Sequence, residues 1–262
     1  MPGFLANLFG ITARRRQRLR AQPFPQAWLA ILHKNVPYYA KLPEADRKEL
    51  EGHIQVLAAE KNFEGCGGLL MTEEIKVTIA AQAGILLLHR EPHYYPGLYS
   101  ILVYPHAFVT EGYEELAPGY RLETEQVHLG ESWQQGSLIL SWDDVRAGAA
   151  DIHDGHNVVF HEFAHQLDTE DGHADGAPVL PRRSMYIAWA RILSREFQNL
   201  REDKRRSRPS LLNQYGATNA AEFFAVATEY FFEKPRQMQD KQPELYEELK
   251  MFYQQDPVRL LS

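Results

Sequence analysis

Apolar residues recur at helical spacing near both ends of the chain, whereas its middle contains short β-like runs. Over residues 45–62 the apolar side chains recur every three to four positions and charges fill the other face, as on an amphipathic helix. Thr72 is a favourable N-cap, and residues 73–89 are apolar nearly all round, which predicts a helix inside the core. In chain order, the pattern predicts helices at 23–37, 45–62, 73–89, 157–167, 181–200, 219–232 and 243–253, and strands at 99–104 and 137–142.

This order of helices, short strands and helices again predicts an α+β fold with a helical core and a small, mostly antiparallel sheet. Turn-rich and polar residues separate the two strands, and we expect the charged residues 201–209 to form an exposed connection. We also expect a flexible basic arm over residues 1–22 and a single domain over residues 23–262. This domain divides into a helical part at about 23–92 and a second part at about 93–262.

The composition of the chain restricts its possible metal ligands more than it restricts its fold. The chain has 262 residues, of which 44% are hydrophobic, so it can bury a core, and its net charge of −7 argues against a dedicated nucleic-acid binder. The single cysteine, Cys66, excludes both an internal disulfide and a zinc site built from several thiolates. Because the chain also has 11 histidines, histidine and carboxylate are the metal ligands to look for.

The N-terminal residues predict neither a secretory signal nor a membrane span. Residues 1–13 are apolar, but the positive charges of residues 14–20 follow them, which is the reverse of the order in a signal peptide. The apolar run at 77–88 is too short to cross a bilayer. Together with the lone cysteine, this predicts a cytoplasmic protein, whose basic arm is either a solvated end or a contact for a membrane or a partner.

The segment NVVFHEFAHQLD at residues 157–168 carries the clearest candidate chemistry. His161 and His165 are four residues apart, so on a helix they project from one face and can bind a single zinc ion. Glu162, beside the first histidine, is then placed to act as a general base on a water molecule. The alternative is a helix whose histidines only cap the helix or pair locally.

A catalytic zinc ion needs a third protein ligand, and the segment at residues 214–232 offers two carboxylates. Glu222 and Glu229 are seven residues apart, so on a helix they share a face but lie roughly 10 Å apart along the axis. Only one of them can therefore join the two histidines. The spacing does not decide between them, and a solvent-facing charge is the ordinary role of a glutamate.

Two segments of the chain resemble the Mlc titration factor A family of bacterial zinc peptidases and, more distantly, the catalytic domain of anthrax lethal factor. HEFAHQLD at 161–168 matches the HExxH segment of the family, and YGATNAAEFFA at 215–225 is similar to the lethal factor segment that carries its third zinc ligand. SWQQG at 132–136 and FYQQDP at 252–257 also resemble titration factor segments. The resemblance covers most of the chain and implies a zincin-like metallopeptidase domain.

Carried over residue by residue, the resemblance implies one zinc ion per chain, with His161, His165 and Glu222 as its ligands. It gives Glu162 the role of general base and later proton donor. Tyr215 matches a tyrosine that would stabilise the developing oxyanion. These roles agree with the chemistry of zinc, which acidifies a water molecule and polarises a carbonyl group.

Two further carboxylates are candidates for supporting the ligands. Asp168 matches the aspartate that follows the second histidine, and would orient a ligand imidazole. Lethal factor has a glutamate four residues beyond its ligand glutamate, whereas this chain has Val226, so that supporting role is absent here or is taken by Glu229. We also expect a substrate peptide to pair, as an added strand, with the strand at 137–142.

These residues predict a cytoplasmic zinc metallopeptidase, and the resemblance implies aminopeptidase activity on small peptides. The titration factor is named for binding the Mlc glucose repressor, so the resemblance also implies this repressor as a partner and a link to glucose uptake. The alternative is a regulatory protein that sequesters the repressor and has only secondary peptidase activity. A metal site without catalysis is a third possibility. The residues themselves contain no dedicated motif for binding a substrate amine.

Overall fold

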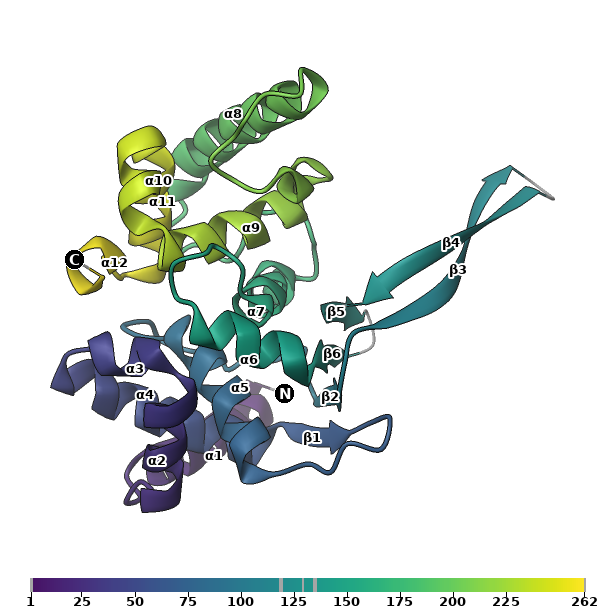
Figure 1. Ribbon diagram of the computed structural model, residues 1–262. Coiled ribbons are helices and arrows are strands. Elements are labelled where there is room, and N and C mark those ends of the chain that lie inside the picture. The colour runs from purple at the N-terminus through teal and green to yellow at the C-terminus, as the bar shows by residue number, and fades with distance from the viewer. Residues whose placement is uncertain (1, 118–119, 129, 134–135, 262) are drawn as a thin grey trace.

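In the computed structural model, a small sheet lies at one side of a helical body, in which the N-terminal helices lie on one side of the central helices and the C-terminal helices on the other (Figure 1). The structure describes the backbone of residues 2–117, 120–128, 130–133 and 136–261, and the side chains of residues 11–107 and 136–261. The helices are α1 (Pro2–Arg20), α2 (Gln26–Asn35), α3 (Pro37–Lys41), α4 (Glu44–Glu60), α5 (Glu73–Ile85), α6 (Trp142–Ala150), α7 (Val158–Asp168), α8 (Met185–Arg205), α9 (Ala220–Glu233), α10 (Pro235–Lys241), α11 (Pro243–Tyr253) and α12 (Pro257–Leu260). The strands are β1 (Asn62–Gly65), β2 (Ser100–Tyr104), β3 (Phe108–Ala117), β4 (Tyr120–His128), β5 (Gly130–Trp133) and β6 (Ser137–Ser141), and two short 3-10 helices are η1 (Thr169–Asp171) and η2 (Gln214–Ala217).

The predicted α+β class and the predicted helices are confirmed, although several helix ends differ from the expectation, among them both ends of α8. Helix α5 ends at Ile85, before a turn in which His89 adopts a positive φ of 63°. Helix α8 continues to Arg205, through residues that we expected to form a connection. Charged residues are compatible with an exposed helix, and Glu202 forms ion pairs one turn away with Arg205 and Arg206 that support it.

The prediction of a mostly antiparallel sheet is wrong. The four-stranded sheet has the order β1-β2-β6-β5, in which β1 pairs with β2 and β2 with β6 in parallel, and β5 with β6 is the antiparallel pair. The helix that we predicted over residues 45–62 included the first residue of β1, and we predicted no strand there, which hid the β1-α5-β2 unit. Because parallel neighbours need a crossover such as α5, missing β1 removed the signal for a parallel sheet.

The strand at 137–142 is also not a free edge. Strand β6 pairs with β2 on one side and with β5 on the other, so a peptide cannot be added to it. Strand β5 is the outer strand on that side. The residues between β2 and β5 form a second, two-stranded sheet of β3 and β4, where the glutamate-rich sequence shows no clear alternation of apolar residues.

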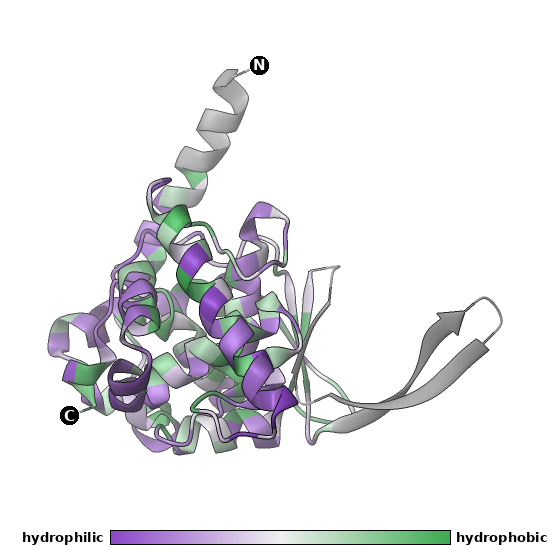
Figure 2. Ribbon diagram, turned by 90° about the horizontal axis from the view of Figure 1, so that it is seen from above, coloured by the Kyte–Doolittle hydropathy of each residue, from purple (hydrophilic) through white to green (hydrophobic). Residues whose placement is uncertain are grey.

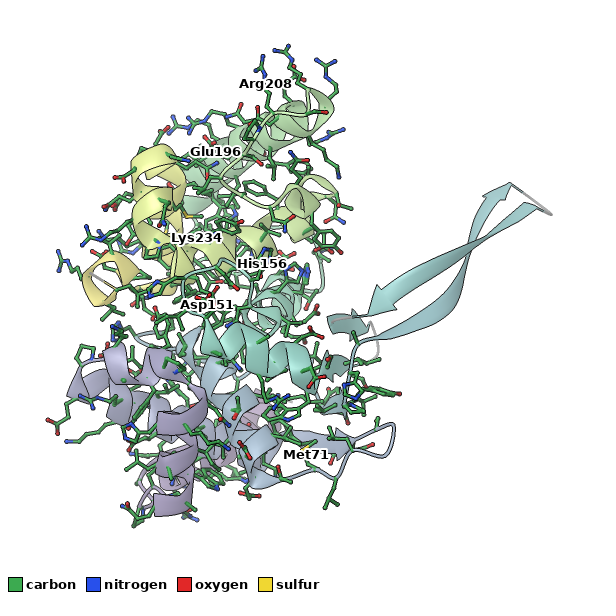
Figure 3. All side chains as sticks on the ribbon, in the orientation of Figure 1. Met71, Asp151, His156, Glu196, Arg208 and Lys234 are labelled. Atoms are coloured by element: carbon green, nitrogen blue, oxygen red, sulfur yellow. The ribbon has the colours of Figure 1, made fainter. Side chains whose placement is uncertain are left out.

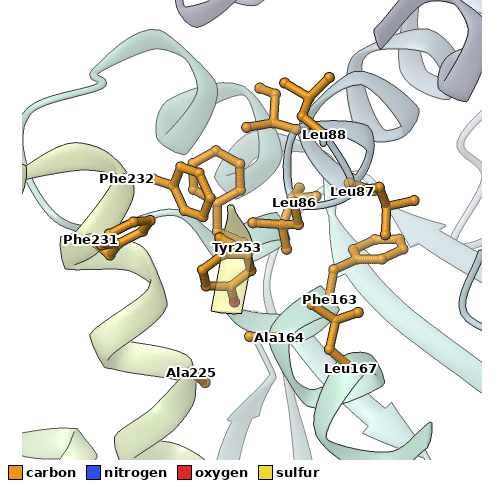
Figure 4. Packing of buried hydrophobic residues seen from close by; sticks show 14 of the residues in the cluster. Leu86, Leu87, Leu88, Phe163, Ala164, Leu167, Ala225, Phe231, Phe232 and Tyr253 are labelled. Atoms are coloured by element: carbon orange, nitrogen blue, oxygen red, sulfur yellow. The ribbon is translucent and has the colours of Figure 1, made fainter. Parts of the chain in front are cut away.

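The core fixes helix α7 from two directions. The ring of Phe163 packs edge-on against Tyr95 with 4.7 Å between the ring centroids, and Figure 4 shows it beside the buried residues 86–88. Ala164 lies on the side of α7 toward Tyr253 and Ala225, where α7 and α9 pack together (Figure 4). Figure 2 shows the same division for the body as a whole, with hydrophilic residues on the outward helix faces and hydrophobic residues between the helices. The core therefore holds helix α7 rigidly, and this fixes the positions of the side chains on the face of α7 that is not packed in the core.

The basic residues that we expected in a flexible arm lie on α1, and residues 11–20 of this helix are held against α4. The guanidinium group of Arg16 contacts both carboxylate oxygens of Glu60 at 2.8–3.1 Å and lies 4.7 Å from the centre of the Tyr94 ring. In the described part of the chain, no helix has the length and apolar character needed to cross a bilayer. The division of the domain at about residue 92 remains a prediction.

Gly176 connects the end of α7 with the start of α9. Its N–H donates to Oδ2 of Asp168 at 2.9 Å, and its carbonyl accepts from the indole N–H of Trp189 at 3.0 Å. The φ angle of Gly176 is +75°, and a Cβ atom here would lie 2.5 Å from the carbonyl oxygen of Ala220, in the first turn of α9. Only glycine fits both the left-handed backbone and the close approach.

We predict that Gly176→Ala destabilises the protein by about 3 kcal/mol or more, because it combines left-handed strain with displacement of α9. Gly172→Ala is the matched control, since Gly172 also has a positive φ, of 93°, but has no atom within 4 Å of the Cβ position. It should cost about 1–2 kcal/mol. Urea unfolding measures both values. Equal losses for the two variants would show that the contact with Ala220 does not constrain the fold.

Candidate metal centre

Helix α7 presents two histidines on the face that is not packed in the core. The Asn157 side chain caps the helix by accepting from the N–H of Phe160 at 3.0 Å, which fixes where the helix begins. His161 and His165 follow, each with a side chain that is about one-seventh exposed (14% and 13%). Their Nε2 atoms lie 3.3 Å apart. The prediction that the four-residue spacing places both imidazoles on one helix face is confirmed.

Helix α9 brings Glu222 to the same point. The side chain of Asn219 caps α9 by accepting from the N–H of Glu222 at 2.9 Å, so this glutamate lies in the first turn. Its Oε2 atom is 3.0 Å from Nε2 of His161 and 3.4 Å from Nε2 of His165. Two helices that are 61 residues apart at these positions thus bring three donor atoms together.

The spacing of the three donors fits a tetrahedral metal ion. Bonds of about 2.0–2.1 Å in a tetrahedron place neighbouring ligand atoms about 3.3–3.4 Å apart, and the three separations here are 3.0, 3.3 and 3.4 Å. Among the residues that the structure describes, His161, His165 and Glu222 are the one group of three or more metal-ligating side chains close enough to hold an ion. Two imidazoles and one carboxylate leave the fourth position open, as in catalytic rather than structural zinc sites.

Glu229 contacts the opposite nitrogen of the same histidine. Its Oε1 atom lies 2.8 Å from Nδ1 of His161, and its Oε2 accepts from the backbone N–H of Asn157 at 2.7 Å. A carboxylate on Nδ1 fixes the imidazole orientation and leaves Nε2 available for a metal ion. The two glutamates between which the spacing could not decide therefore both reach His161, one at each ring nitrogen.

The charges at this site attract a cation even without a metal ion. Burial favours the neutral imidazole of His161, but the hydrogen bonds with Glu222 and Glu229 outweigh burial and raise its pKa to about 10. Burial also opposes ionisation of Glu222, yet the two histidines lower the pKa of this carboxyl group. The proton on Nε2 of His161 therefore competes with a divalent cation for this nitrogen.

Glu162 lies next to the donor atoms but does not join them. Its side chain is 4% exposed, and its Oε2 atom has no hydrogen-bond partner among the described residues. Burial raises the pKa of Glu162 to about 7 despite the opposing effect of the two histidines. A carboxyl group that titrates near neutral pH can both accept and return a proton, which is what general acid–base catalysis requires.

Tyr215 and Asp168 have different relations to the centre. Tyr215 lies on η2 with its ring 6.0 Å from the ring of His161, centroid to centroid, and it lines the same cavity. Asp168 accepts from the backbone N–H of Gly176, and among the described residues it makes no hydrogen bond to His161 or His165. Asp168 therefore holds the loop after α7 in place. Of the two carboxylates that we considered as supports for the ligands, Glu229 is the one that contacts a histidine of the centre.

A cavity of about 450 Å³ adjoins the centre at His161 and Glu162, and its volume is within the range of small-ligand sites of ~300–1,000 Å³. His156, labelled in Figure 3, lies in the loop before α7 and contributes to the cavity wall. Neither His156 nor His153 belongs to the metal-ligating group. The cavity is lined by Asp144, Ala147, Gly148, Asp154, His156, Asn157, Val158, His161, Glu162, Asn213, Tyr215, Val226 and Glu229.

Sequence reasoning missed the residues that hold the loop before α7. The Asn157 side chain donates to the carbonyl of Gly148 at 3.2 Å and to Oε1 of Glu233 at 3.1 Å, so it ties α6, α7 and α9 together. Burial raises the pKa of Glu233 to about 9, and its side chain shares a hydrogen bond with Asp154. An asparagine directly before a helix is a signal for its cap, but no pattern in the sequence marks its contact with Glu233.

Comparisons with known proteins agree with this geometry. The family described as glucose-regulated metallo-peptidase M90 matches residues 11–254 of the chain. An uncharacterised protein of Synechocystis is 42% identical over 247 residues, covering 93% of this chain and 89% of that protein. Mlc titration factor A of Yersinia pestis is 30% identical over 244 residues, covering 91% of this chain and 89% of the relative, and the protein of the same name from Yersinia pseudotuberculosis gives the same values.

The protonated state of His161 leads to a prediction about metal binding. Because a metal ion can bind Nε2 only after the imidazolium loses its proton, uptake of Zn²⁺ at pH 8 should release at least one proton per ion. The apparent affinity should rise about tenfold per pH unit between pH 6 and 9, below the pKa of His161. Isothermal titration calorimetry in buffers of different ionisation enthalpy measures the released protons. Binding at pH 8 without proton release would contradict the paired state of His161.

Proposed function

Because this chain belongs to the glucose-regulated metallo-peptidase family M90, we propose that it is a zinc-dependent peptidase that removes residues from the amino end of small peptides. The observation that supports this most directly is the tetrahedral spacing of His161, His165 and Glu222 beside the buried carboxyl group of Glu162. Membership of the family implies a metal ion, and two imidazoles with one carboxylate suit zinc. Cleavage from the amino end is the more specific part of the proposal, and it rests on the resemblance to the titration factor.

In this proposal His161, His165 and Glu222 hold the zinc ion through Nε2, Nε2 and Oε2. Zinc, when bound, supplies an acidified water molecule and polarises the scissile carbonyl group. Glu229 keeps the proton of His161 on Nδ1 and thereby directs Nε2 toward the ion. The supporting role that we considered for Asp168 is limited to holding the loop at Gly176.

Glu162 moves the proton that hydrolysis requires. Its carboxylate takes a proton from the attacking water as the new C–O bond forms, and later delivers this proton to the amine nitrogen as the C–N bond breaks. In the metal-free protein, burial raises the pKa of this group to about 7, and a bound zinc ion would lower it toward the ionised form that accepts the proton of water. Tyr215 lines the same cavity, and its hydroxyl donates to the oxyanion that develops on the carbonyl oxygen.

A second function is supported by the name of the Yersinia relatives, Mlc titration factor A. In this alternative the chain binds the Mlc repressor and so regulates glucose uptake, with peptidase activity in a secondary role. We place either activity in the cytoplasm, as the single cysteine suggests. The two functions separate experimentally, because binding of a repressor does not require Glu162 to move a proton.

The ligand assignment makes a prediction about metal content. His161→Ala and Glu222→Ala each remove a proposed ligand, so zinc in the purified protein should fall from about one ion per chain to below about 0.2. Glu229→Ala is the matched control on the same helix, and it should weaken zinc binding by about 10- to 100-fold without abolishing it. Inductively coupled plasma mass spectrometry measures the metal. If Glu229→Ala removes zinc and Glu222→Ala retains it, the assignment is wrong.

The proton-transfer role predicts that Glu162→Gln retains zinc and loses hydrolysis. The amide keeps the shape of the side chain but cannot accept the proton of water, so the rate constant for cleaving an unblocked peptide should fall at least 1,000-fold. Equal turnover by wild type and variant would exclude the proposed mechanism. The same variant tests the second function, since undiminished capture of purified Mlc would show a binding role that is independent of catalysis.

A further inference from the structure

The cavity beside the metal centre is lined by acidic residues. Among the described residues, four carboxylates contribute to its wall and no lysine or arginine does. A site of this charge favours a cationic ligand. Which carboxylate can bind such a ligand depends on the partners that each carboxylate already has.

Two of the four carboxylates are engaged within the protein. Glu229 uses one oxygen for His161 and the other for the N–H of Asn157. Asp154 accepts from the N–H of His156 at 2.8 Å and shares a hydrogen bond with Glu233. A third, Glu162, lies beside the donor atoms and has the proton-transfer role proposed above.

The fourth carboxylate, Asp144, has one oxygen without such a partner among the described residues. It lies in the first turn of α6, where its backbone N–H donates to the side chain of Ser141, but its Oδ2 atom is buried and has no hydrogen-bond partner among the described residues. A buried polar atom without a partner is unfavourable, so a donor in the cavity gains a hydrogen bond when this side chain turns toward it. The adjacent Asp143 differs, because its oxygens contact His106 and Arg146.

The position of Asp144 at the start of a helix explains its charge but not its unpartnered oxygen. The N–H groups of a first turn favour an acidic residue, and this accounts for the charge. It does not account for a buried oxygen that no donor of the described residues reaches, on a residue that lines one cavity together with His161, Glu162 and Tyr215.

We propose that Asp144 binds an ammonium group of the substrate and so determines which peptide bond lies at the metal centre. This inference rests on the proposed peptidase function and deepens it. The ammonium group is either the free α-amine of a peptide or the side chain of a lysine, which have the same chemistry. An α-amine held at a fixed place in a cavity of about 450 Å³ would restrict cleavage to the first bonds of a peptide.

Binding is measured in the Glu162→Gln background, so that no peptide is consumed. The probes are tetra-alanine, its N-acetyl form, and an N-acetylated tetrapeptide with one lysine, each titrated into zinc-loaded protein by calorimetry. Asp144→Asn keeps the side-chain shape and removes the charge. Asp143→Asn is the matched control, because it makes the same change at the neighbouring residue outside the cavity. Zinc content and thermal unfolding confirm that each variant is intact.

We expect Asp144→Asn to weaken binding of tetra-alanine by roughly 10- to 100-fold, as loss of a close charge pair does, and to leave the N-acetyl form unchanged. Asp143→Asn should change neither. A loss confined to the lysine peptide would support the same ammonium site with the side chain as its source. Equal effects of Asp144→Asn on free and acetylated alanine peptides, or no effect on any probe, would overturn the proposal.

Hydrolysis separates this inference from the function on which it rests. In the active enzyme, Asp144→Asn should raise KM for tetra-alanine by a similar factor and change kcat less than about threefold. If wild type cleaves tetra-alanine and Asp144→Asn does so with the same KM, the role of Asp144 fails and the peptidase function stands. If zinc-loaded wild type cleaves no peptide, the proposed function itself fails.

Discussion

The imidazole of His161, held between two carboxylates of one helix, is the interaction on which the site depends. Glu222 and Glu229 are two helical turns apart, about 10 Å along the axis of α9, and the imidazole spans this gap with one nitrogen 3.0 Å from Glu222 and the other 2.8 Å from Glu229. The seven-residue spacing therefore has a physical meaning. Glu222 lies at Nε2, on the metal side of the ring, while Glu229 fixes the tautomer by its contact with Nδ1.

This arrangement requires α7 and α9 to keep a fixed relation, and the protein secures it with both apolar and polar contacts. The aromatic residues of the core hold the inner face of α7. On the loop before it, Asn157 caps α7 with its side-chain oxygen and donates to Glu229 and Glu233 with its two kinds of N–H group. The same residue thus sets where the helix starts and how α9 lies beside it. Rigid support of this kind is what lets a site bind a metal ion with little rearrangement.

The sequence predicted the parts of the site that depend on local periodicity. The histidine pair follows from helical spacing alone, and so does the placement of both glutamates on one face of a helix. The choice between Glu222 and Glu229 depends on how two helices 61 residues apart pack. The spacing of residues within one helix carries no information about this packing. The parallel sheet was missed because the short strand β1 begins within the predicted helix over residues 45–62. Asp144 was missed because the sequence does not show that its Oδ2 atom lacks a partner among the described residues.

A crystal structure of the zinc-loaded protein, with anomalous scattering recorded at the zinc edge, tests the central claim most directly. We expect a single strong anomalous peak within about 2.0–2.2 Å of Nε2 of His161, Nε2 of His165 and an oxygen of Glu222. Glu229 should remain on Nδ1 of His161, and Glu162 should stay outside the coordination sphere. A peak coordinated by Glu229 or Glu162 in place of Glu222, or no peak between the two helices, would contradict it.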